Sequence, residues 1–317
     1  MNKILITRPL PTPVESRAKT LGDITFRKET SPLSVFEMTS ALEQFDIILP
    51  TLGDLFSEEI FAQVSVPRCK LLANFAVGYN HIDVAAAKAK GIIVTNTPGA
   101  VTDATADIAL TLMLMTARRA GEGERLLRSG KWKGWHPTQM LGLHFSNKTV
   151  SIVGMGRIGQ AVARRCHFGF GMKIFYVSRS LKRLDFPAKK CPTISEAASK
   201  ADFLVVSVPG GKDTKHLIDA SVFSVMQRHA IFVNIARGDV VCEAALVQAL
   251  KDGKIAGAGL DVYEFEPVVP DDLNSMENVT LFPHLGTASL EVRIGMGNMA
   301  LDNIEAFLKG QNPTNLV

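Results

Sequence analysis

The stretch Thr149-Val-Ser-Ile-Val-Gly-Met-Gly-Arg-Ile-Gly159 decides the fold of this chain. Its first five residues form a short apolar run typical of a buried strand, and a helix-forming sequence follows the last glycine. Between them, Gly154, Gly156 and Gly159 have the G-x-G-x-x-G spacing of a loop that binds a dinucleotide pyrophosphate. The first glycine permits a tight turn, the second lets phosphate approach the backbone, and the third lets helix and strand pack closely. An ordinary glycine turn is the alternative, but a second strand candidate at Lys173–Val177 favours the nucleotide-binding interpretation.

Length and composition indicate a globular protein of two domains. The chain has 317 residues, which is about two domains by the usual relation of length to domain number. Its hydrophobic fraction of 46% and charged fraction of 21% are ordinary for folded proteins and argue against a disordered or fibrous chain. The net charge of +4 comes from 35 basic and 31 acidic residues spread along the sequence, so neither nucleic acid nor a membrane surface is an expected partner.

Neither metal binding nor membrane insertion is expected. The N-terminal residues resemble a strand and lack the features of a signal peptide. The longest apolar run, Ile108–Ala117, is too short to span a membrane and is typical of a buried helix. We therefore expect a soluble cytoplasmic protein. Four cysteines without CxxC spacing or clustered histidines predict reduced thiols and no metal site: Cys69, Cys166, Cys191 and Cys242.

The first 98 residues predict one parallel α/β domain, because short apolar strand candidates alternate there with helix-like stretches. One of these stretches, Val84–Lys90, is followed by Gly91, which is typical of a helix C-terminus. The strand candidates are 4–6, 46–49, 71–75 and 92–94.

A second α/β series follows a break at Asn96–Gly99. It begins with a long helical region predicted over 102–127, and it contains six strand candidates that match a doubly wound nucleotide-binding domain. The helical pattern over 289–308 has no strand of its own and is expected to return to the first domain. We therefore predict a discontinuous substrate-binding domain, 1–98 plus 287–317, and a dinucleotide-binding domain, 99–286. The six strand candidates are 150–153, 174–177, 203–208, 231–235, 258–262 and 280–282.

Three charged or titratable residues follow three strands of the second series. Ligands of open α/β sheets bind beyond the carboxyl ends of the strands, where Arg237, Glu266 and His284 are expected to lie. Taken singly, each residue is better explained by a solvated turn, an acidic loop or a satisfied histidine. Taken together they fit hydride transfer between a nicotinamide and a 2-oxo or 2-hydroxy acid, which needs a proton donor, a partner that keeps it charged and a cation for the carboxylate. His284 suits the role of proton donor, and Glu266 suits that of the partner that keeps it charged. Arg237 suits the role of the cation that binds the carboxylate.

These motifs resemble the D-isomer-specific 2-hydroxyacid dehydrogenase family over nearly the whole chain. The resemblance implies two Rossmann-like or flavodoxin-like doubly wound domains, with the active site in the cleft between them, and a homodimer. It places the family's catalytic arginine, glutamate and histidine on Arg237, Glu266 and His284. It also implies that the backbone of Val77 and Gly78 binds the substrate carboxylate and that a loop around Leu52 and Gly53 closes over it. The segments that carry the resemblance are 76–83, 96–99, 154–159, 236–238, 259–263, 266–267 and 283–286.

The end of the second nucleotide strand predicts NADPH as the cofactor. An acidic residue there would bind the ribose 2′-hydroxyl of NAD, whereas this chain has Ser178, Arg179 and Ser180 and no acid. Arginine and serine can donate hydrogen bonds to a 2′-phosphate, although a merely solvated basic turn is the alternative. Further cofactor contacts are expected at Met155, Arg157, Ile158, Val208, Pro209, Ile235, Ala236, Asp261 and Gly286.

Within the family, the chain resembles NADPH-dependent glyoxylate and hydroxypyruvate reductases. We therefore predict reduction of glyoxylate to glycolate and of hydroxypyruvate to D-glycerate, with His284 as the general acid. The alternatives are a dehydrogenase for a larger 2-oxo acid such as phenylpyruvate, and a non-catalytic dinucleotide sensor. Trp135 is predicted either to cross a dimer interface and line the partner's substrate pocket, or to form part of the interface core.

Overall fold

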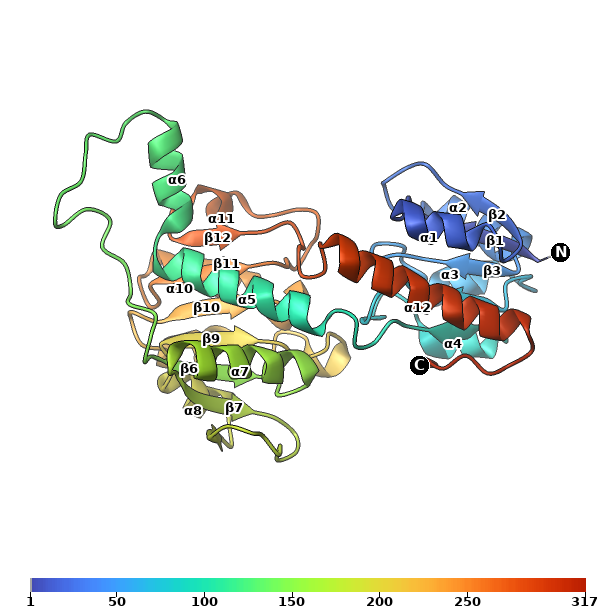
Figure 1. Cartoon of the computed structure of the whole chain (residues 1–317). Helices are drawn as coiled ribbons and strands as arrows, with labels where there is room; N and C mark the ends of the chain where they lie inside the picture. Colours follow the sequence, from blue (N-terminus) through green and yellow to red (C-terminus); the bar gives the residue numbers. More distant parts are fainter. Residues whose placement is uncertain (1) are drawn as a thin grey trace. The chain divides into compact units, whose positions relative to one another are not determined.

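A computed structural model describes residues 2–317 and divides them into two compact units. The first unit consists of the chain up to Val101 together with Ala288–Val317, and the second consists of Thr102–Thr287. The boundaries between the units therefore fall at 101/102 and 287/288. The sequence analysis had placed them at 98/99 and 286/287. Each unit is built around its own parallel sheet (Figure 1).

The sheet of the first unit has the strand order β2-β1-β3-β4-β5, and all its strand pairs are parallel. This is the doubly wound order in which the strand sequence reverses between β1 and β3, and ligands of such folds bind at the carboxyl edge beside that reversal. The sequence analysis missed β2, because its four residues, Asp-Ile-Thr-Phe, form a half-exposed edge strand without an apolar run. The strands are β1 Lys3–Ile6, β2 Asp23–Phe26, β3 Ile47–Leu49, β4 Leu71–Ala73 and β5 Ile93–Thr95.

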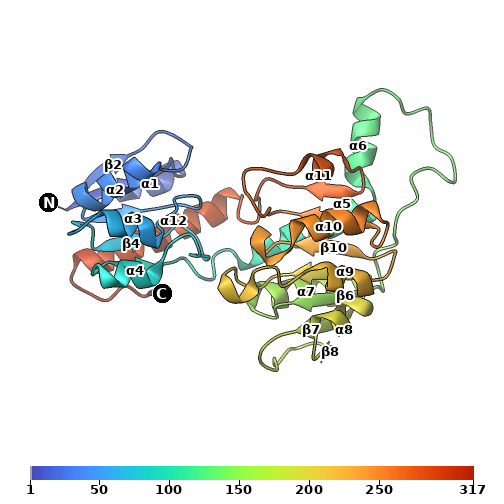
Figure 2. The same ribbon diagram turned by 180° about the vertical axis from the view of Figure 1, so that it is seen from behind.

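Helices cover both faces of this sheet. The hydrophobic core on one face joins the strands to α2, α3 and α4, whereas α12 contacts α1 and β4 on the other (Figures 1 and 2). Helix α12 packs closely on α1, since a Cβ atom added at Gly297 would lie 2.6 Å from the side chain of Val14. The C-terminal helix thus belongs to the first unit. The helices are α1 Thr12–Ala18, α2 Val35–Gln44, α3 Glu58–Gln63, α4 Val84–Ala89 and α12 Leu290–Leu308.

The sheet of the second unit has the parallel order β12-β11-β10-β9-β6-β7-β8. It is the doubly wound order of nucleotide-binding domains with a seventh strand added, and the order reverses between β6 and β9. The sequence analysis expected six strands and missed β8, a three-residue edge strand of sequence Ala-Lys-Lys. The strands are β6 Thr149–Val153, β7 Lys173–Val177, β8 Ala188–Lys190, β9 Phe203–Val206, β10 Ile231–Asn234, β11 Gly257–Leu260 and β12 Val279–Leu281.

Two hydrophobic cores sandwich this second sheet. One joins the sheet to α5 and α7, and the other joins its opposite face to α8, α9 and α10. Within residues 2–317, no helix is both long and apolar enough to cross a membrane. The helices are α5 Thr102–Ala117, α6 Ala120–Arg128, α7 Arg157–Phe170, α8 Ile194–Ser199, α9 Ala220–Val225, α10 Glu243–Lys251 and α11 Asp271–Ser275.

The helical region predicted over 102–127 consists of two helices, α5 and α6, with a break between them. Arg119 has a left-handed φ of 53° at this break. The two helices differ in burial, since α5 has seven buried residues and α6 has none. Helix α6 and residues 129–141 form an arm that extends from the second unit (Figure 1). Burial of α5 against the sheet therefore decides where that helix ends.

Candidate active site

The three catalytic candidates follow three neighbouring parallel strands of the second unit. Arg237 follows β10, Glu266 follows β11 and His284 follows β12. Because the strands are parallel and adjacent, their carboxyl ends share one edge of the sheet. Side chains far apart in the sequence are brought to the same edge in this way.

His284 and Glu266 form a hydrogen-bonded pair. The two atoms that join them, Nδ1 of His284 and Oε2 of Glu266, are 2.9 Å apart. The other carboxylate oxygen of Glu266 accepts the N–H of Tyr263 at 3.0 Å. Burial opposes ionisation of Glu266, but the hydrogen bond and charge of His284 and the N–H of Tyr263 hold its pKa below the ordinary value. Since an ionised carboxylate only accepts hydrogen bonds, Nδ1 carries the proton and Nε2 is the ring nitrogen that remains for chemistry.

Asp261 holds the loop that carries His284. Its side chain is buried, and its two oxygens accept the N–H groups of Leu285 at 2.6 Å and Gly286 at 2.8 Å. The backbone carbonyl of Asp261 accepts the N–H of His284, whose φ of 56° is left-handed. Burial raises the pKa of Asp261, while these N–H donors and the charge of His284 oppose the rise. Asp261 was predicted as a cofactor contact, and the structure shows it beneath the His284 loop.

Arg237 lies in a turn that is fixed on both sides. The buried side chain of Asn234 accepts the N–H of Ala236 and donates to the carbonyl of Arg237, both at 3.0 Å. Gly238 packs directly on the neighbouring segment, because an added Cβ atom would lie 1.8 Å from the carbonyl of Tyr263. Burial lowers the pKa of Arg237, and the charges of Glu266 and Asp239 oppose that shift. Sequence reasoning missed Asn234, although an asparagine that ends a buried strand is a usable signal.

A cavity of about 340 Å³ lies beside the pair, entirely within the second unit. Glu266 and His284 contribute to its wall together with apolar residues from the segment before α11 and from β12. The hydroxyl of Tyr263 donates to the carbonyl of Phe282 at 2.9 Å, which ties the Glu266 segment to the His284 segment. The residues that line the cavity are Tyr263, Glu266, Pro267, Val269, Asn274, Leu281, Phe282, Pro283 and His284.

The three glycines of the fingerprint have the three geometries that a dinucleotide pyrophosphate requires. Gly154 has a φ of +103° and touches the backbone of Val208, and Gly159 packs against Gly154, where an added Cβ atom would lie 2.1 Å from the Gly154 carbonyl. Gly156 is exposed, precedes α7 and has no atom within 4 Å of an added Cβ position. The open backbone at Gly156 and the N-terminus of α7 therefore fit a pyrophosphate group.

The other cofactor candidates lie around this turn. Met155 is buried in the core, so only its backbone is available, whereas Arg157 is exposed. Ser207, which sequence reasoning missed, donates its hydroxyl to the Gly154 carbonyl at 2.7 Å and fixes the turn to the end of β9. The remaining candidates are placed as follows: Ile158, Ser178 and Val208 half-buried, Arg179, Ser180 and Pro209 exposed, and Ile235, Ala236 and Gly286 buried.

In the first unit, two asparagine side chains orient the turn at Val77 and Gly78. Asn96 donates to the carbonyl of Val77 at 2.9 Å, and Asn74 donates to the carbonyls of Ala76 and Gly78 at 3.2 and 3.0 Å. The C=O and N–H of a trans peptide point in opposite directions. The N–H groups of Val77 and Gly78 are therefore directed away from the asparagines, and they have no hydrogen-bond partner among residues 2–317. Such a turn can bind a carboxylate.

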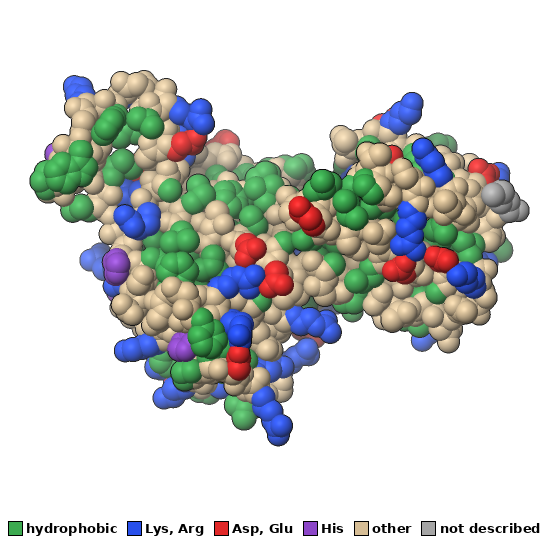
Figure 3. Space-filling model, viewed as in Figure 1, with side chains coloured by type: hydrophobic (Ala, Val, Ile, Leu, Met, Phe, Trp, Pro, Cys, Tyr) green, Lys and Arg blue, Asp and Glu red, His purple; other side chains and the backbone are tan. Residues whose placement is uncertain are grey.

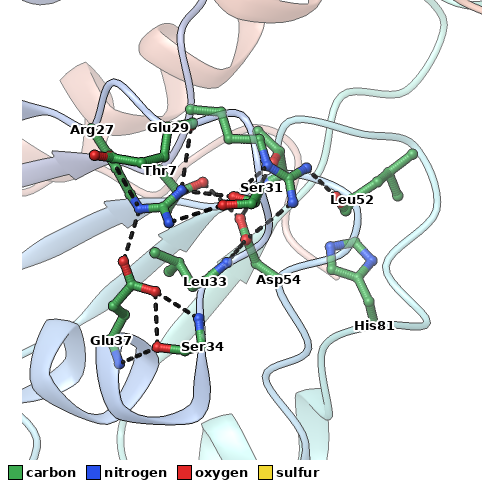
Figure 4. Close-up of polar contacts among 12 residues, drawn as sticks. Thr7, Arg27, Glu29, Ser31, Leu33, Ser34, Glu37, Leu52, Asp54 and His81 are labelled. Carbon is green, nitrogen blue, oxygen red and sulfur yellow. Dashed lines mark hydrogen bonds and ion pairs between the residues drawn. The ribbon is translucent and has the colours of Figure 1, made fainter. Parts of the chain in front are cut away.

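The loop at Leu52 follows β3 at the same edge of the first sheet. It is held by Asp54, a fully buried carboxylate that sequence reasoning missed (Figure 4). Asp54 accepts the N–H groups of Thr51 and Leu33 at 2.8 and 3.0 Å and the hydroxyl of Thr7 at 2.7 Å. Three loops therefore meet on one side chain. Among the described residues, no group of three histidine, cysteine, aspartate or glutamate side chains is arranged to hold a metal ion.

Comparison with known proteins defines the class. Residues 110–286 match the family model of the D-isomer specific 2-hydroxyacid dehydrogenase, NAD binding domain. The chain is 42% identical to a glyoxylate reductase of Thermococcus kodakarensis, over 99% of this chain and 96% of that protein. It is 36% identical to a glycerate dehydrogenase of Hyphomicrobium methylovorum, over 97% and 96%.

A solved structure agrees with these sequence relatives. The NADPH-dependent glyoxylate/hydroxypyruvate reductase of Sinorhizobium meliloti, crystallised with NADP and malonate, matches with a TM-score of 0.88 and 34% identity. The match covers 100% of this chain and 96% of that chain. The chain therefore belongs to the D-isomer-specific 2-hydroxyacid dehydrogenase family, and its second unit is a nicotinamide dinucleotide-binding domain.

Proposed function

We propose that this protein is an NADPH-dependent reductase of small 2-oxo acids, converting glyoxylate to glycolate and hydroxypyruvate to D-glycerate. The observation that carries the proposal is the His284–Glu266 hydrogen bond at the carboxyl ends of β11 and β12, beside the turn that holds Arg237. Support also comes from relatives that are glyoxylate reductases and a glycerate dehydrogenase.

In this proposal the first unit is the substrate-binding domain. The N–H groups at the Val77–Gly78 turn bind the substrate carboxylate, and the loop at Leu52 closes over the bound acid. A carboxylate bound by backbone N–H groups carries no penalty from a buried unpaired charge, because each oxygen accepts oriented donors. Arg237 from the second unit adds a planar guanidinium that binds the carboxylate and polarises the oxygen on C2.

His284 is the general acid of the proposed reaction. Its Nδ1 proton is held by Glu266, so Nε2 delivers a proton to the oxygen on C2. Glu266 stabilises the charged imidazolium and fixes its ring orientation. When bound, the reduced nicotinamide supplies the hydride that C2 receives. In the reverse direction His284 takes the proton back from the hydroxy acid.

The second unit is proposed to hold NADPH. The backbone around Gly156 and the N-terminus of α7 bind the pyrophosphate, and Ser178, Arg179 and Ser180 bind the 2′-phosphate. Support for the phosphate comes from the end of β7, where this short segment carries an arginine and two hydroxyls and no acid.

We also propose a homodimer in which the arm of the second unit takes part. Apolar side chains are exposed along this arm, and Figure 3 shows hydrophobic groups on its surface. Such side chains in water favour burial against another protein surface. The exposed residues and their exposed fractions are Leu127 62%, Trp132 48%, Trp135 79% and Leu141 67%.

The test is steady-state oxidation of NADPH and, separately, of NADH with glyoxylate, hydroxypyruvate and phenylpyruvate. We expect the highest kcat/KM for NADPH with the two small acids. A clear preference for phenylpyruvate would replace the substrate assignment, and a preference for NADH would replace the cofactor assignment. Tight dinucleotide binding without turnover of any acid would favour a sensor.

A further inference from the structure

Arg8 lies beside the loop at Leu52 and contacts it directly. Its Nη1 donates to the carbonyl of Leu52, and its Nε lies 3.4 Å from the carbonyl of Ser31. Its Nη2 lies 3.6 Å from Oδ1 of the fully buried Asp54, and its own side chain is 18% exposed. The guanidinium therefore joins three segments at the carboxyl edge of the first sheet: those after β1 and β3, and the one between β2 and α2.

This cluster occupies the point where the strand order of the sheet reverses. The loops after β1 and β3 diverge there, and ligands of doubly wound sheets bind beside such a divergence. Asp54 braces the divergence through the hydroxyl of Thr7 after β1 (Figure 4). It also accepts the N–H of Thr51 after β3. The geometry of the Leu52 loop is thus determined by a buried charge and not by the loop sequence alone.

Arg8 sets the direction of one peptide group in this loop. The carbonyl of Leu52 points to Arg8, so the N–H of Gly53 on the same peptide points the opposite way. Gly53 is exposed, and its φ of +96° is a conformation that favours glycine. Its N–H has no hydrogen-bond partner among residues 2–317. Asn96 orients the Gly78 N–H in the same manner, because its side-chain amide donates to the carbonyl of Val77.

We propose that Arg8, braced by Asp54, is a positioning residue that directs the Gly53 N–H as an additional donor for the substrate carboxylate. This inference rests on the proposed function, in which the Leu52 loop closes over a 2-oxo acid. Arg8 does not touch the substrate in this scheme. It acts through one peptide group, and Asp54 neutralises its charge so that the guanidinium stays bound to the loop.

The matched control is Arg27. It is another largely buried arginine of the same region, with an 11% exposed side chain that bonds Glu37 at 3.0 Å and the carbonyl of Ser31 at 2.7 Å (Figure 4). It forms no hydrogen bond or ion pair with Leu52 or Asp54. Loss of Arg27, like loss of Arg8, removes an arginine that contacts Ser31 in the segment between β2 and α2. It nevertheless leaves the carbonyl of Leu52 bound to Arg8.

The experiment compares Arg8→Ala, Arg8→Lys and Arg27→Ala with the unaltered enzyme. We expect Arg8→Ala to raise the KM for glyoxylate about tenfold or more, as for loss of one charge-assisted hydrogen bond. Its kcat should stay within about twofold and its Kd for NADPH should not change. Arg8→Lys should recover part of the loss, because lysine can still donate to the Leu52 carbonyl. A general folding defect would instead lower kcat through loss of active protein, and it would affect Arg27→Ala as well.

Asp54→Asn supplies a second variant, with a lower Tm and a raised KM expected from loss of one buried acceptor.

An unchanged KM in Arg8→Ala, or an equal increase in Arg27→Ala, would overturn the positioning role. If the unaltered enzyme reduces no 2-oxo acid, the proposed function fails separately. In that case oxamate binding measured by calorimetry decides the inference: weaker binding by Arg8→Ala than by Arg27→Ala supports it, and equal binding overturns it.

Discussion

Nδ1 of His284 and Oε2 of Glu266 lie 2.9 Å apart, although 18 residues separate them in the chain. The distance is that of a charge-assisted hydrogen bond between an imidazolium and a carboxylate. The pair exists because β11 and β12 are adjacent and parallel, and because the buried Asp261 holds the loop that carries His284. Removing the charge of Glu266 therefore affects both the orientation of the imidazole and the stability of this edge of the sheet.

Glu266→Gln is expected to lower kcat for glyoxylate reduction about 10- to 100-fold, since hydrogen bonds to charged groups contribute roughly 1.5–3 kcal/mol. The pKa of Glu266 lies below its ordinary value of 4.5, so its stabilising contribution is complete above that pH and is lost as the pH falls through the lowered value. Urea unfolding of the unaltered protein and of Glu266→Gln at pH 7 and near pH 3 measures this stabilising contribution. The difference in unfolding free energy should shrink at the lower pH; a constant difference would contradict an ionised pair.

Arg237→Ala is expected to lower kcat/KM for glyoxylate by about 100-fold, mostly through KM, because two charge-assisted hydrogen bonds to the carboxylate are lost. Arg237→Lys keeps the charge but not the planar guanidinium, so it should recover only a small part of the lost kcat/KM. Steady-state kinetics with a separate titration of NADPH measures both effects. Equal activity of the lysine variant and the unaltered enzyme would exclude bidentate binding.

Gly156→Ala tests the fingerprint without disturbing the fold. An added Cβ at Gly156 meets no atom within 4 Å, so Tm should not change, yet the methyl group would obstruct the close approach of a pyrophosphate. We expect the Kd for NADPH to rise about tenfold or more in a fluorescence titration. Gly295→Ala in α12, where an added Cβ is equally unobstructed, is the matched control and should leave the Kd unaltered. Unchanged NADPH binding by the Gly156 variant would place the pyrophosphate elsewhere.

Ser178→Asp places an acid directly after β7, where it would repel a 2′-phosphate and accept the ribose hydroxyls of NADH. The ratio of kcat/KM for NADPH to that for NADH should fall by about tenfold or more, given the strength of hydrogen bonds to charged groups. Both cofactors are compared at saturating glyoxylate. A ratio that does not move would mean that the 2′-phosphate is not recognised at this turn.

Trp135→Ala tests the arm. This side chain is 79% exposed, so its loss should not destabilise the isolated chain. We expect weaker dimerisation by light scattering at dilute concentrations, and a raised KM for glyoxylate or hydroxypyruvate if the indole lines the partner's pocket. If neither the mass nor the KM values change, both interpretations of Trp135 are wrong.

Local sequence patterns were sufficient for the features that depend on neighbouring residues. The strand and glycine spacing of Thr149–Gly159 determined the nucleotide-binding turn, since each glycine is required by the backbone conformation or packing at its own position. The strand ends likewise indicated Arg237, Glu266 and His284, because the carboxyl ends of parallel strands meet at one edge. The pairing of the last two followed from strand order, which an alternating α/β pattern largely specifies.

Only the tertiary structure decided the features that depend on burial and on distant partners. Strands β2 and β8 lack an apolar pattern and exist because a neighbouring strand supplies hydrogen bonds. The break at Arg119 appears where α5 leaves the sheet and loses its buried face. Asp54 is unremarkable in the sequence, and its role arises because folding brings Thr7, Leu33 and Thr51 to one buried carboxylate. A buried charge needs partners from distant segments of the chain, because an unpaired charge in the interior is costly. The spacing of apolar residues along the sequence does not predict which residues those partners are.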